Sequence, residues 1–296
     1  MSKQYRVLYL FILPGAVLLI LFHYLPIYGI TIAFKDFKPM LGIAGSEWVG
    51  FQNFIDAFNS IFFWRVLRNT LTINILQLLF GFPAPIILAV LLNEIRFETG
   101  KRVIQTITYL PHFLSWVVVG GFVASVLSPN QGVIALVSEA LTGTRADVFP
   151  LIEPGWFPWI IVGSGIWQSV GWGSIIYIAA ISGINPELYE ACIIDGGNRW
   201  HQIWNITIPS IMPTIFVLLI LRIGRLLGSN FEQIYVLLNP SVYSTGDVIS
   251  TYVFREGIGK GSFSFTATIG LFQSLIGFVL MLIANAASKR LGRSLW

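Results

Sequence analysis

The sequence predicts an all-α membrane protein with six transmembrane helices, because both its composition and its apolar runs are typical of that class. Of the 296 residues, 55% are hydrophobic and only 11% are charged, whereas ordinary soluble domains carry roughly 25% charged residues. A helix needs roughly 20 apolar residues to cross the hydrocarbon core of a bilayer, and runs of this length recur along the chain. The composition excludes an ordinary soluble globule. It also excludes a disordered chain, since disorder requires low hydrophobicity.

Six apolar runs are long enough to cross a membrane. The first run follows Lys3 and Arg6, as in a signal peptide, but it exceeds the roughly 7–15-residue apolar core of such peptides, so we expect it to be retained. Pro83, Pro85 and Pro111 fall inside predicted spans and indicate bends, since proline leaves a backbone carbonyl without its helical partner. We expect a single transmembrane domain over residues 1–296, with spans at about 7–34, 69–93, 103–127, 157–181, 208–231 and 263–287.

Lysine and arginine residues near the ends of the runs indicate the orientation. With the N-terminus in the cytoplasm, the short cytoplasmic segments hold nine of these residues and the longer outer segments hold seven. An even number of spans then places both basic termini in the cytoplasm, in agreement with the positive-inside rule. We expect a multi-pass protein of the cytoplasmic membrane, surrounded by lipid. The outer segment 35–68 is expected to lie at the interface, because Trp48, Phe51, Phe54 and Phe58 recur at helical spacing.

The titratable residues do not form the pattern of an enzyme site. Cys192 is the only cysteine, which excludes an internal disulfide and a Cys-rich metal site. His23, His112 and His201 are far apart in the sequence, so we do not expect a zinc site. The net charge of +4 flanks the membrane runs instead of forming one basic stripe, so no nucleic-acid partner is expected. We predict no catalytic residue, no metal and no cofactor on this chain.

The cytoplasmic segment between the fourth and fifth runs contains the signals of a short helix at about 185–197. Asn185 is a suitable N-cap, and Pro186 suits the first helical position. Glu187 then lies near the positive end of the helix dipole, and Gly196 is a typical residue at a helix end. A short amphipathic helix across the cytoplasmic mouth of a pore is typical of a docking element. A solvated linker between two spans is the alternative interpretation.

The same segment resembles the EAA motif of binding-protein-dependent ABC importer permeases. That motif reads Glu-Ala-Ala, two residues, Asp-Gly-Ala and then a spaced Ile-x-Leu-Pro. Cys192, Gly197 and Ile208 depart from it by small or apolar exchanges that keep the glycine and the spacing. In this chain the motif reads Glu190-Ala191-Cys192, Asp195-Gly196-Gly197 and Ile206-Thr207-Ile208-Pro209.

Shorter matches extend the resemblance over essentially the whole chain. They are similar to the complex-carbohydrate, LplB-like branch of these permeases, as is a tryptophan near the C-terminus. The matching segments are Phe11–Gly15, Tyr24–Gly29, Ile32–Phe37, Phe231–Tyr235, Asp247–Tyr252 and Gly270–Ser274.

The resemblance implies the type I ABC importer permease fold and a set of partners. In such importers two permeases, often different chains, line one path, and we expect a heterodimer here. Two ATP-binding subunits hold ATP and Mg beneath the membrane, and an extracytoplasmic solute-binding protein delivers a sugar, here expected to be an oligosaccharide. The chain would move that sugar by alternating access. The residues that would couple it to the ATPase are Glu187, Glu190, Ala191, Cys192, Asp195, Gly196, Gly197 and Pro209.

The chain itself lacks the motif of an ATPase. A P-loop requires the spacing Gly-x-x-x-x-Gly-Lys-Ser/Thr, so that its backbone N–H groups surround phosphate. The segment Gly257–Gly261 has neither this spacing nor a Ser or Thr after Lys260. We therefore expect ATP hydrolysis on a separate chain.

Two arginines fall within the fifth predicted span. Counted from Ile208, Arg222 lies about 21 Å along a helix, which is past the middle of the bilayer. Arginine at such depth usually faces the bundle interior or water. Arg222, Arg225 and Ser229 would share one helix face, with Asn230 following. We hypothesise that they line the sugar path and attract an acidic sugar, since arginine binds carboxylate in bidentate fashion.

The alternative is that the two arginines pair with Glu232 or extend towards the outer interface. Other candidates for the path are aromatic residues, which stack on sugar rings, and amides, which bond hydroxyl groups. Each of these alone is also explained by packing. They are Trp167, Gln168, Trp172, Asn74, Gln77 and Gln273.

Two other functions compete with a subunit of an ATP-driven importer. A stand-alone secondary transporter normally shows internal repeats or carboxylates within its spans, and we find neither apart from Glu232 near a span end. A membrane enzyme requires acid, base or metal groups that converge at one membrane face. The scattered carboxylates and histidines of this chain do not predict such a group, so transport without chemistry on this chain is favoured.

Overall fold

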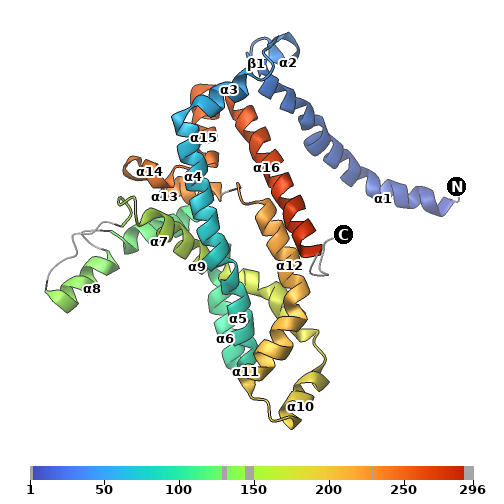
Figure 1. The fold of residues 1–296 in the computed structure, drawn as a ribbon, viewed down its shortest axis with the longest axis vertical. Helices are drawn as coiled ribbons and strands as arrows, with labels where there is room; N and C mark the ends of the chain where they lie inside the picture. The colour runs from blue at the N-terminus through green and yellow to red at the C-terminus, as the bar shows by residue number, and fades with distance from the viewer. Residues whose placement is uncertain (1–2, 129–131, 144–149, 229, 290–296) are drawn as a thin grey trace. The chain divides into compact units, whose positions relative to one another are not determined.

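The computed structural model describes residues 3–128, 132–143, 150–228 and 230–289, and this part of the chain is almost entirely helical. Figure 1 shows its helices in chain order. The chain divides into two compact units. Unit 1 comprises Met1–Trp64 and Tyr252–Leu275, and unit 2 comprises Arg65–Thr251 and Ile276–Trp296. The all-α class predicted from the sequence is therefore confirmed. The expected single domain stays a prediction.

Unit 1 begins with a long apolar helical stretch and continues into a small hairpin. The hairpin strands are antiparallel, with Lys35 opposite Trp48. α4, α15 and α16 run from one unit into the other, so they carry residues of both. The elements are α1 (Lys3–Leu19), η1 (Ile20–Tyr24), η2 (Leu25–Phe34), β1 (Lys35–Asp36), α2 (Gly42–Gly45), β2 (Glu47–Trp48), α3 (Gln52–Asn59), α15 (Ile249–Phe254), η7 (Arg255–Gly259) and α16 (Phe263–Lys289).

Aromatic packing and two hydrogen bonds from an asparagine side chain hold unit 1 together. The ring of Phe34 stacks on Trp48 with centroids 5.7 Å apart. Asn53 Nδ2, on α3, donates to the carbonyl oxygens of Ala33 at 2.9 Å and Lys35 at 3.0 Å. Of the four aromatic residues expected at helical spacing, Phe54 and Phe58 lie on α3, whereas Trp48 belongs to β2 and Phe51 precedes the helix. The hydrogen bonds of Asn53 fix α3 to the end of η2.

Unit 2 contains the remaining helices. A π-helical turn separates α4 from α5, because the proline at the start of α5 has no N–H and the Phe82 N–H bonds Gln77 O at 3.0 Å instead. The elements are α4 (Ile61–Leu76), η3 (Gln77–Gly81), α5 (Pro83–Glu94), α6 (Glu98–Tyr109), η4 (Leu110–Phe113), α7 (Trp116–Val126), α8 (Val133–Thr142), α9 (Phe157–Ser182), α10 (Pro186–Ile194), α11 (Arg199–Gln202), η5 (Ile203–Thr207), α12 (Ile208–Gly224), α13 (Phe231–Leu237), η6 (Pro240–Val242) and α14 (Tyr243–Gly246).

α9 is the central helix of unit 2, and its glycines allow close packing. A Cβ atom on Gly173 would lie 3.0 Å from the side chain of Pro85 on α5, and one on Gly171 would meet the carbonyl of Thr108 on α6. Two apolar clusters hold the helix in place. One contains Ile73, Phe157, Ile161, Ile234, Leu237, Val242 and Val248, and the other contains Ala89, Val90, Tyr177, Ile181 and Ile211.

The helices confirm an integral membrane protein, but they do not confirm six spans. Within the described residues, four helical stretches are long and apolar enough to cross a membrane, and a bent pair, Glu98–Phe113 and Trp116–Val126, would make a fifth. α9 has the necessary length but is not among them, because Gly, Ser, Gln and Trp residues dilute its apolar run. Six spans stay a prediction. The four stretches are Tyr9–Phe34, Ile61–Glu94, Arg199–Gly224 and Phe263–Lys289.

Two predicted spans differ from the structure. The run 103–127 is not one helix, since it bends by 105° between η4 and α7. The break follows Pro111, and Ser115 starts the new helix by accepting a hydrogen bond from the N–H of Val118 at 3.4 Å. The run 208–231 ends early at Gly224, where a turn follows with the N–H of Gly228 bonded to Arg225 O at 2.8 Å.

Candidate functional site

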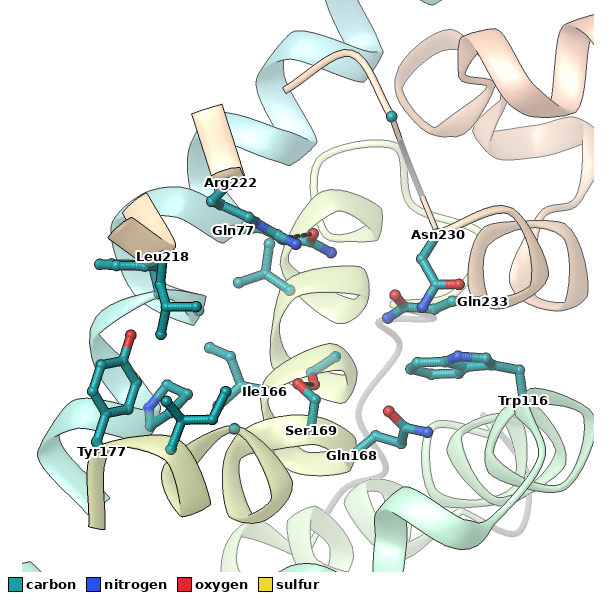
Figure 2. Close-up of a pocket in the computed structure, with 18 residues that line it drawn as sticks. Gln77, Trp116, Ile166, Gln168, Ser169, Tyr177, Leu218, Arg222, Asn230 and Gln233 are labelled. Atoms are coloured by element: carbon teal, nitrogen blue, oxygen red, sulfur yellow. Dashed lines mark hydrogen bonds between the residues drawn. The ribbon is translucent and has the colours of Figure 1, made fainter. Parts of the chain in front are cut away.

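A cavity of about 400 Å³ lies within unit 2. Its walls come from η3, α5, α7, α9, α12 and the segment that begins α13. Figure 2 shows polar and apolar side chains around the cavity, with Asn230, Gln233 and Gln168 near the ring of Trp116. The labelled lining residues are Gln77, Trp116, Ile166, Gln168, Ser169, Tyr177, Leu218, Arg222, Asn230 and Gln233.

The charged group of the cavity is Arg222, in the last turn of α12. Its Nη2 donates to Oε1 of Gln77 at 2.8 Å, the contact drawn as a dashed line in Figure 2. Gln77 is the first residue of the π-helical turn η3, so a residue of one predicted span holds an arginine of another. Among the ion pairs of the described chain, none joins Arg222 or Arg225 to Glu232. The guanidinium is thus hydrogen-bonded but not neutralised by that carboxylate.

Two further amides and an indole form the polar wall. Gln233 is 1% exposed, and its Nε2 donates to Ile161 O at 2.6 Å and Ser164 Oγ at 3.0 Å. In the view of Figure 2, the ring of Trp116 lies between the side chains of Gln233 and Gln168. Buried amides fixed in this way place hydrogen-bonding groups around an aromatic face, an arrangement suited to a sugar ring.

Two of these amides, those of Gln77 and Gln233, lie against Gly165 of α9. A Cβ atom on Gly165 would lie 3.3 Å from Nε2 of Gln233 and 3.7 Å from Nε2 of Gln77. Both amides therefore approach the same face of α9. Apolar side chains, Leu218 and Ile166 among them, complete the lining. The cavity can bind a molecule that has hydroxyl groups, an apolar ring face and a negative charge.

Part of the sugar path predicted from the sequence is gathered in this cavity. Three of its predicted residues are amides on different elements of unit 2, and the fourth is the arginine of α12. These four residues are far apart in the sequence and meet only through the packing of α9 against its neighbours. They are Gln77, Gln168, Arg222 and Asn230.

The other predicted path residues lie elsewhere. Trp167 stacks on Phe122 with centroids 5.7 Å apart, and Trp172 stacks on His112 at 4.7 Å. Neither indole lines the cavity. Trp167 and Gln168 are neighbours on α9, and successive residues of a helix point in different directions, so only one of the two faces the cavity.

The remaining predicted path residues are not among those that line the cavity. Asn74 is buried and donates to Thr70 O at 2.9 Å, one turn back on its own helix. Arg225 follows the end of α12 and does not line the cavity, so it does not share a helix face with the lining residue Arg222 as expected. Gln273 belongs to unit 1. Ser229 lies outside the described residues.

Several lining residues could not be singled out from the sequence. Trp116 lies inside a run that predicted one straight helix, and its placement depends on the break at Ser115. Gln233 follows the predicted end of the fifth span. Ser169 lies one helical turn beyond Gly165 on α9, and its Oγ donates to the carbonyl oxygen of Gly165 at 2.6 Å. The 3.6-residue period aligns these two positions, but the period alone does not show which face of α9 borders a cavity.

The predicted coupling helix falls on α10, whose ends are formed by local signals. Asn185 Oδ1 accepts from the N–H of Glu187 at 3.1 Å. Gly196 has a φ of +80°, the left-handed conformation in which glycine is favoured after a helix end. The N–H of Gly197 donates to Cys192 O at 2.8 Å, which closes the turn.

The surface of α10 presents both carboxylates and apolar side chains. Glu187, Glu190, Ala191 and Asp195 are exposed. Cys192 is half-buried and faces the turn at the helix end. Leu188, Ile193 and Ile194 are also exposed, so α10 presents apolar side chains beside its carboxylates. Pro209 lies apart, in the first turn of α12.

Side-chain contacts tie α10 and α11 to the rest of unit 2. Tyr189 Oη and Thr207 Oγ1 are 2.9 Å apart, which connects α10 to η5. Arg199 Nη1 lies 3.1 Å from Glu94 Oε2, which connects α11 to the end of α5. A cleft of about 580 Å³ opens beside this ion pair. α10 is thus held to the helix that leads to Arg222.

The sequence matches one protein family and resembles named transport proteins. Residues 81–293 match the family described as binding-protein-dependent transport system inner membrane component. Protein LplB of Bacillus subtilis (strain 168) is 45% identical over 97% of this chain and 90% of that protein. The polygalacturonan/rhamnogalacturonan transport system permease protein YteP of the same organism is 42% identical over 98% of this chain and 89% of that protein.

Solved structures agree with these relatives. A bacterial ABC transporter involved in the import of the acidic polysaccharide alginate matches with a TM-score of 0.89 and 42% identity, over 97% of this chain and 96% of that chain. A bacterial alginate ABC transporter in complex with an alginate pentasaccharide-bound periplasmic protein matches with a TM-score of 0.90 and 40% identity, over 99% and 97%.

Proposed function

This chain belongs to the family of binding-protein-dependent transport system inner membrane components, and we propose that its cargo as an ABC importer permease is an acidic oligosaccharide. The fold and the relatives favour an ABC importer over a stand-alone secondary transporter. The observation that carries the proposal for the cargo is Arg222, a charged group in a cavity otherwise lined by amides, hydroxyls, aromatic rings and apolar side chains.

The chemistry of the cavity fits a uronic-acid unit. A guanidinium binds a carboxylate through two parallel N–H···O bonds, which are stronger than bonds between neutral groups. Amides such as Gln168 and Asn230 bond sugar hydroxyls, and the ring of Trp116 offers a face for a pyranose. Two relatives support this choice, since one is named for polygalacturonan transport and one imports alginate, and both polymers are acidic.

The family and the solved neighbour that contains a periplasmic protein support a proposal for the partners. We propose a second permease, expected to be a different chain, and two ATP-binding subunits that hold ATP and Mg and carry out hydrolysis. An extracytoplasmic solute-binding protein would deliver the sugar. The protein would lie in the cytoplasmic membrane with both termini in the cytoplasm, and α10 would contact the ATPase through its carboxylates and its exposed apolar side chains.

The helical stretch Arg199–Gly224 connects the proposed coupling surface with the cavity. It runs without interruption through α11, η5 and α12, over about 39 Å at 1.5 Å per residue. α10 is hydrogen-bonded to this stretch at Thr207, and Arg222 follows 15 residues later, in the last turn of α12. A displacement of α10 by the ATPase would therefore move the guanidinium relative to the cavity walls, as alternating access requires.

Replacing Arg222 by glutamine tests the proposal for the cargo. The importer, assembled with its partners in proteoliposomes, is assayed for ATP-driven uptake of a uronic-acid trisaccharide and of its neutral methyl ester. Because the binding protein is the same in every assay, a change in the uptake ratio between variants reports on the permease. We expect Arg222→Gln to lower the ratio of acidic to neutral uptake about tenfold, the effect of losing one hydrogen-bonded charge pair.

Arg225→Gln is the matched control, because it removes the same charge three residues further on, outside the cavity. An unchanged uptake ratio for Arg222→Gln, in a complex of normal yield, would refute the assignment of the carboxylate to this arginine.

A further inference from the structure

Gln77 is placed to control the arginine of the cavity. Its Oε1 accepts a hydrogen bond from Nη2 of Arg222 at 2.8 Å, across the space between η3 and α12. Both residues line the cavity, and Figure 2 shows the two side chains meeting at its edge. This hydrogen bond therefore orients the guanidinium of Arg222 before a ligand binds.

The backbone conformation at Gln77 is unusual and well defined. Gln77 starts the π-helical turn, and its carbonyl accepts from the N–H of Phe82 at 3.0 Å. A π-helical turn inserts one extra residue in a helix and so re-aims the side chains next to it. On its other side the amide of Gln77 lies against Gly165 of α9, where an added Cβ would be in ordinary contact with Nε2 at 3.7 Å.

We propose that Gln77 is a specificity-determining residue, which holds Arg222 in place for a sugar carboxylate and exchanges its hydrogen bond for that carboxylate. The inference rests on the proposed acidic cargo. A neutral amide oxygen binds a guanidinium more weakly than a carboxylate does, so an acidic sugar displaces Gln77. A neutral sugar offers hydroxyl oxygens or, in a methyl ester, an uncharged carbonyl oxygen, and neither is a stronger acceptor than the amide, so the pair stays closed.

The uncharged nature of Gln77 is the essential feature. A glutamate at this position would form a permanent ion pair with Arg222, and the sugar carboxylate would have to compete with an equal acceptor already in place. Specificity would then be lost through the competing contact, even though the arginine is still present. Gln77→Glu therefore separates the role of the pair from the role of the arginine alone.

The experiment uses the same assembled importer and the same two probes, the uronic-acid trisaccharide and its methyl ester. We expect Gln77→Glu to lower the ratio of acidic to neutral uptake about tenfold, as loss of a charge-assisted contact would. We also expect the exchange Gln77→Arg with Arg222→Gln to restore most of the ratio that Arg222→Gln loses alone. The matched control is Gln168→Arg with Arg222→Gln, which puts the charge elsewhere in the same cavity and should restore little.

The outcomes separate the two proposals. A wild-type ratio in Arg222→Gln refutes the acidic cargo assigned to this arginine, and with it the present inference. A lowered ratio in Arg222→Gln together with a wild-type ratio in Gln77→Glu refutes only the role of Gln77. Equal recovery by the arginines at positions 77 and 168 also refutes it, because the pair geometry would then not matter. If Gln77→Glu does not assemble, the two double variants still decide the question.

Discussion

Replacing Gly196 by alanine tests whether α10 must end in its present turn to bind an ATPase. Gly196 has a φ of +80°, and its N–H donates to Ile193 O at 3.0 Å. No atom lies within 4 Å of a Cβ built on this residue, so the added methyl group meets nothing. The substitution therefore changes the backbone preference of one residue without changing the packing.

The expected magnitude follows from that backbone preference. A left-handed conformation costs an L-residue about 1–2 kcal/mol relative to its ordinary conformations. This energy lowers the population of the native turn roughly 5- to 30-fold relative to alternative turns. Asparagine tolerates the left-handed region better than alanine, so Gly196→Asn should have a smaller effect than Gly196→Ala.

The assay is the amount of ATP-binding subunit that co-purifies with the tagged permease, together with ATP hydrolysis stimulated by the loaded binding protein. We expect Gly196→Ala to reduce both, with Gly196→Asn between it and the wild type. Retention of the ATPase and full stimulation in Gly196→Ala, at normal yield of the permease, would show that the turn is not needed and that the reasoning is wrong.

Two further substitutions test the stability of α10 and the packing of α16. Asn185→Ala removes the N-cap of α10 and should destabilise that helix by about 1 kcal/mol, measured as faster amide hydrogen exchange confined to residues 186–194; unchanged exchange would contradict the capping role. Gly277→Ala would put a Cβ 2.6 Å from the carbonyl oxygen of Gly224 and should lower stability by about 1–3 kcal/mol, seen as a lower melting temperature of the purified chain. Gly270→Ala on the same helix, where a Cβ meets nothing within 4 Å, is the control, and equal melting temperatures for the two variants would contradict this account.

The features that could be predicted from the sequence are those set by local chemistry. The long apolar runs form helices, because a segment in the bilayer core must satisfy its own backbone hydrogen bonds. The bounds of α10 followed from Asn185 at its start and Gly196 at its end, both of which act through hydrogen bonds or backbone conformation within a few residues. The sequence also indicated the family, since the family's motif lies in one continuous segment.

The features that could not be predicted depend on contacts between distant segments. Pro111 indicated a bend, but its size of 105° depends on how η4 and α7 pack against neighbouring helices. Hydropathy alone did not show that α12 ends at Gly224, because leucines follow within a few residues. For the same reason the cavity wall was predicted in part. Gln77 and Arg222 stood out as polar residues within apolar runs, whereas Trp116 resembled any buried aromatic residue.

The most direct test of the central claim is to purify the tagged chain in mild detergent and identify by mass spectrometry the proteins that accompany it. An ABC importer permease is expected to bring with it an ATP-binding subunit that contains a P-loop, and a second permease chain. Recovery of the chain alone, folded and able to carry sugar across a membrane without ATP, would contradict the account and would instead indicate a secondary transporter.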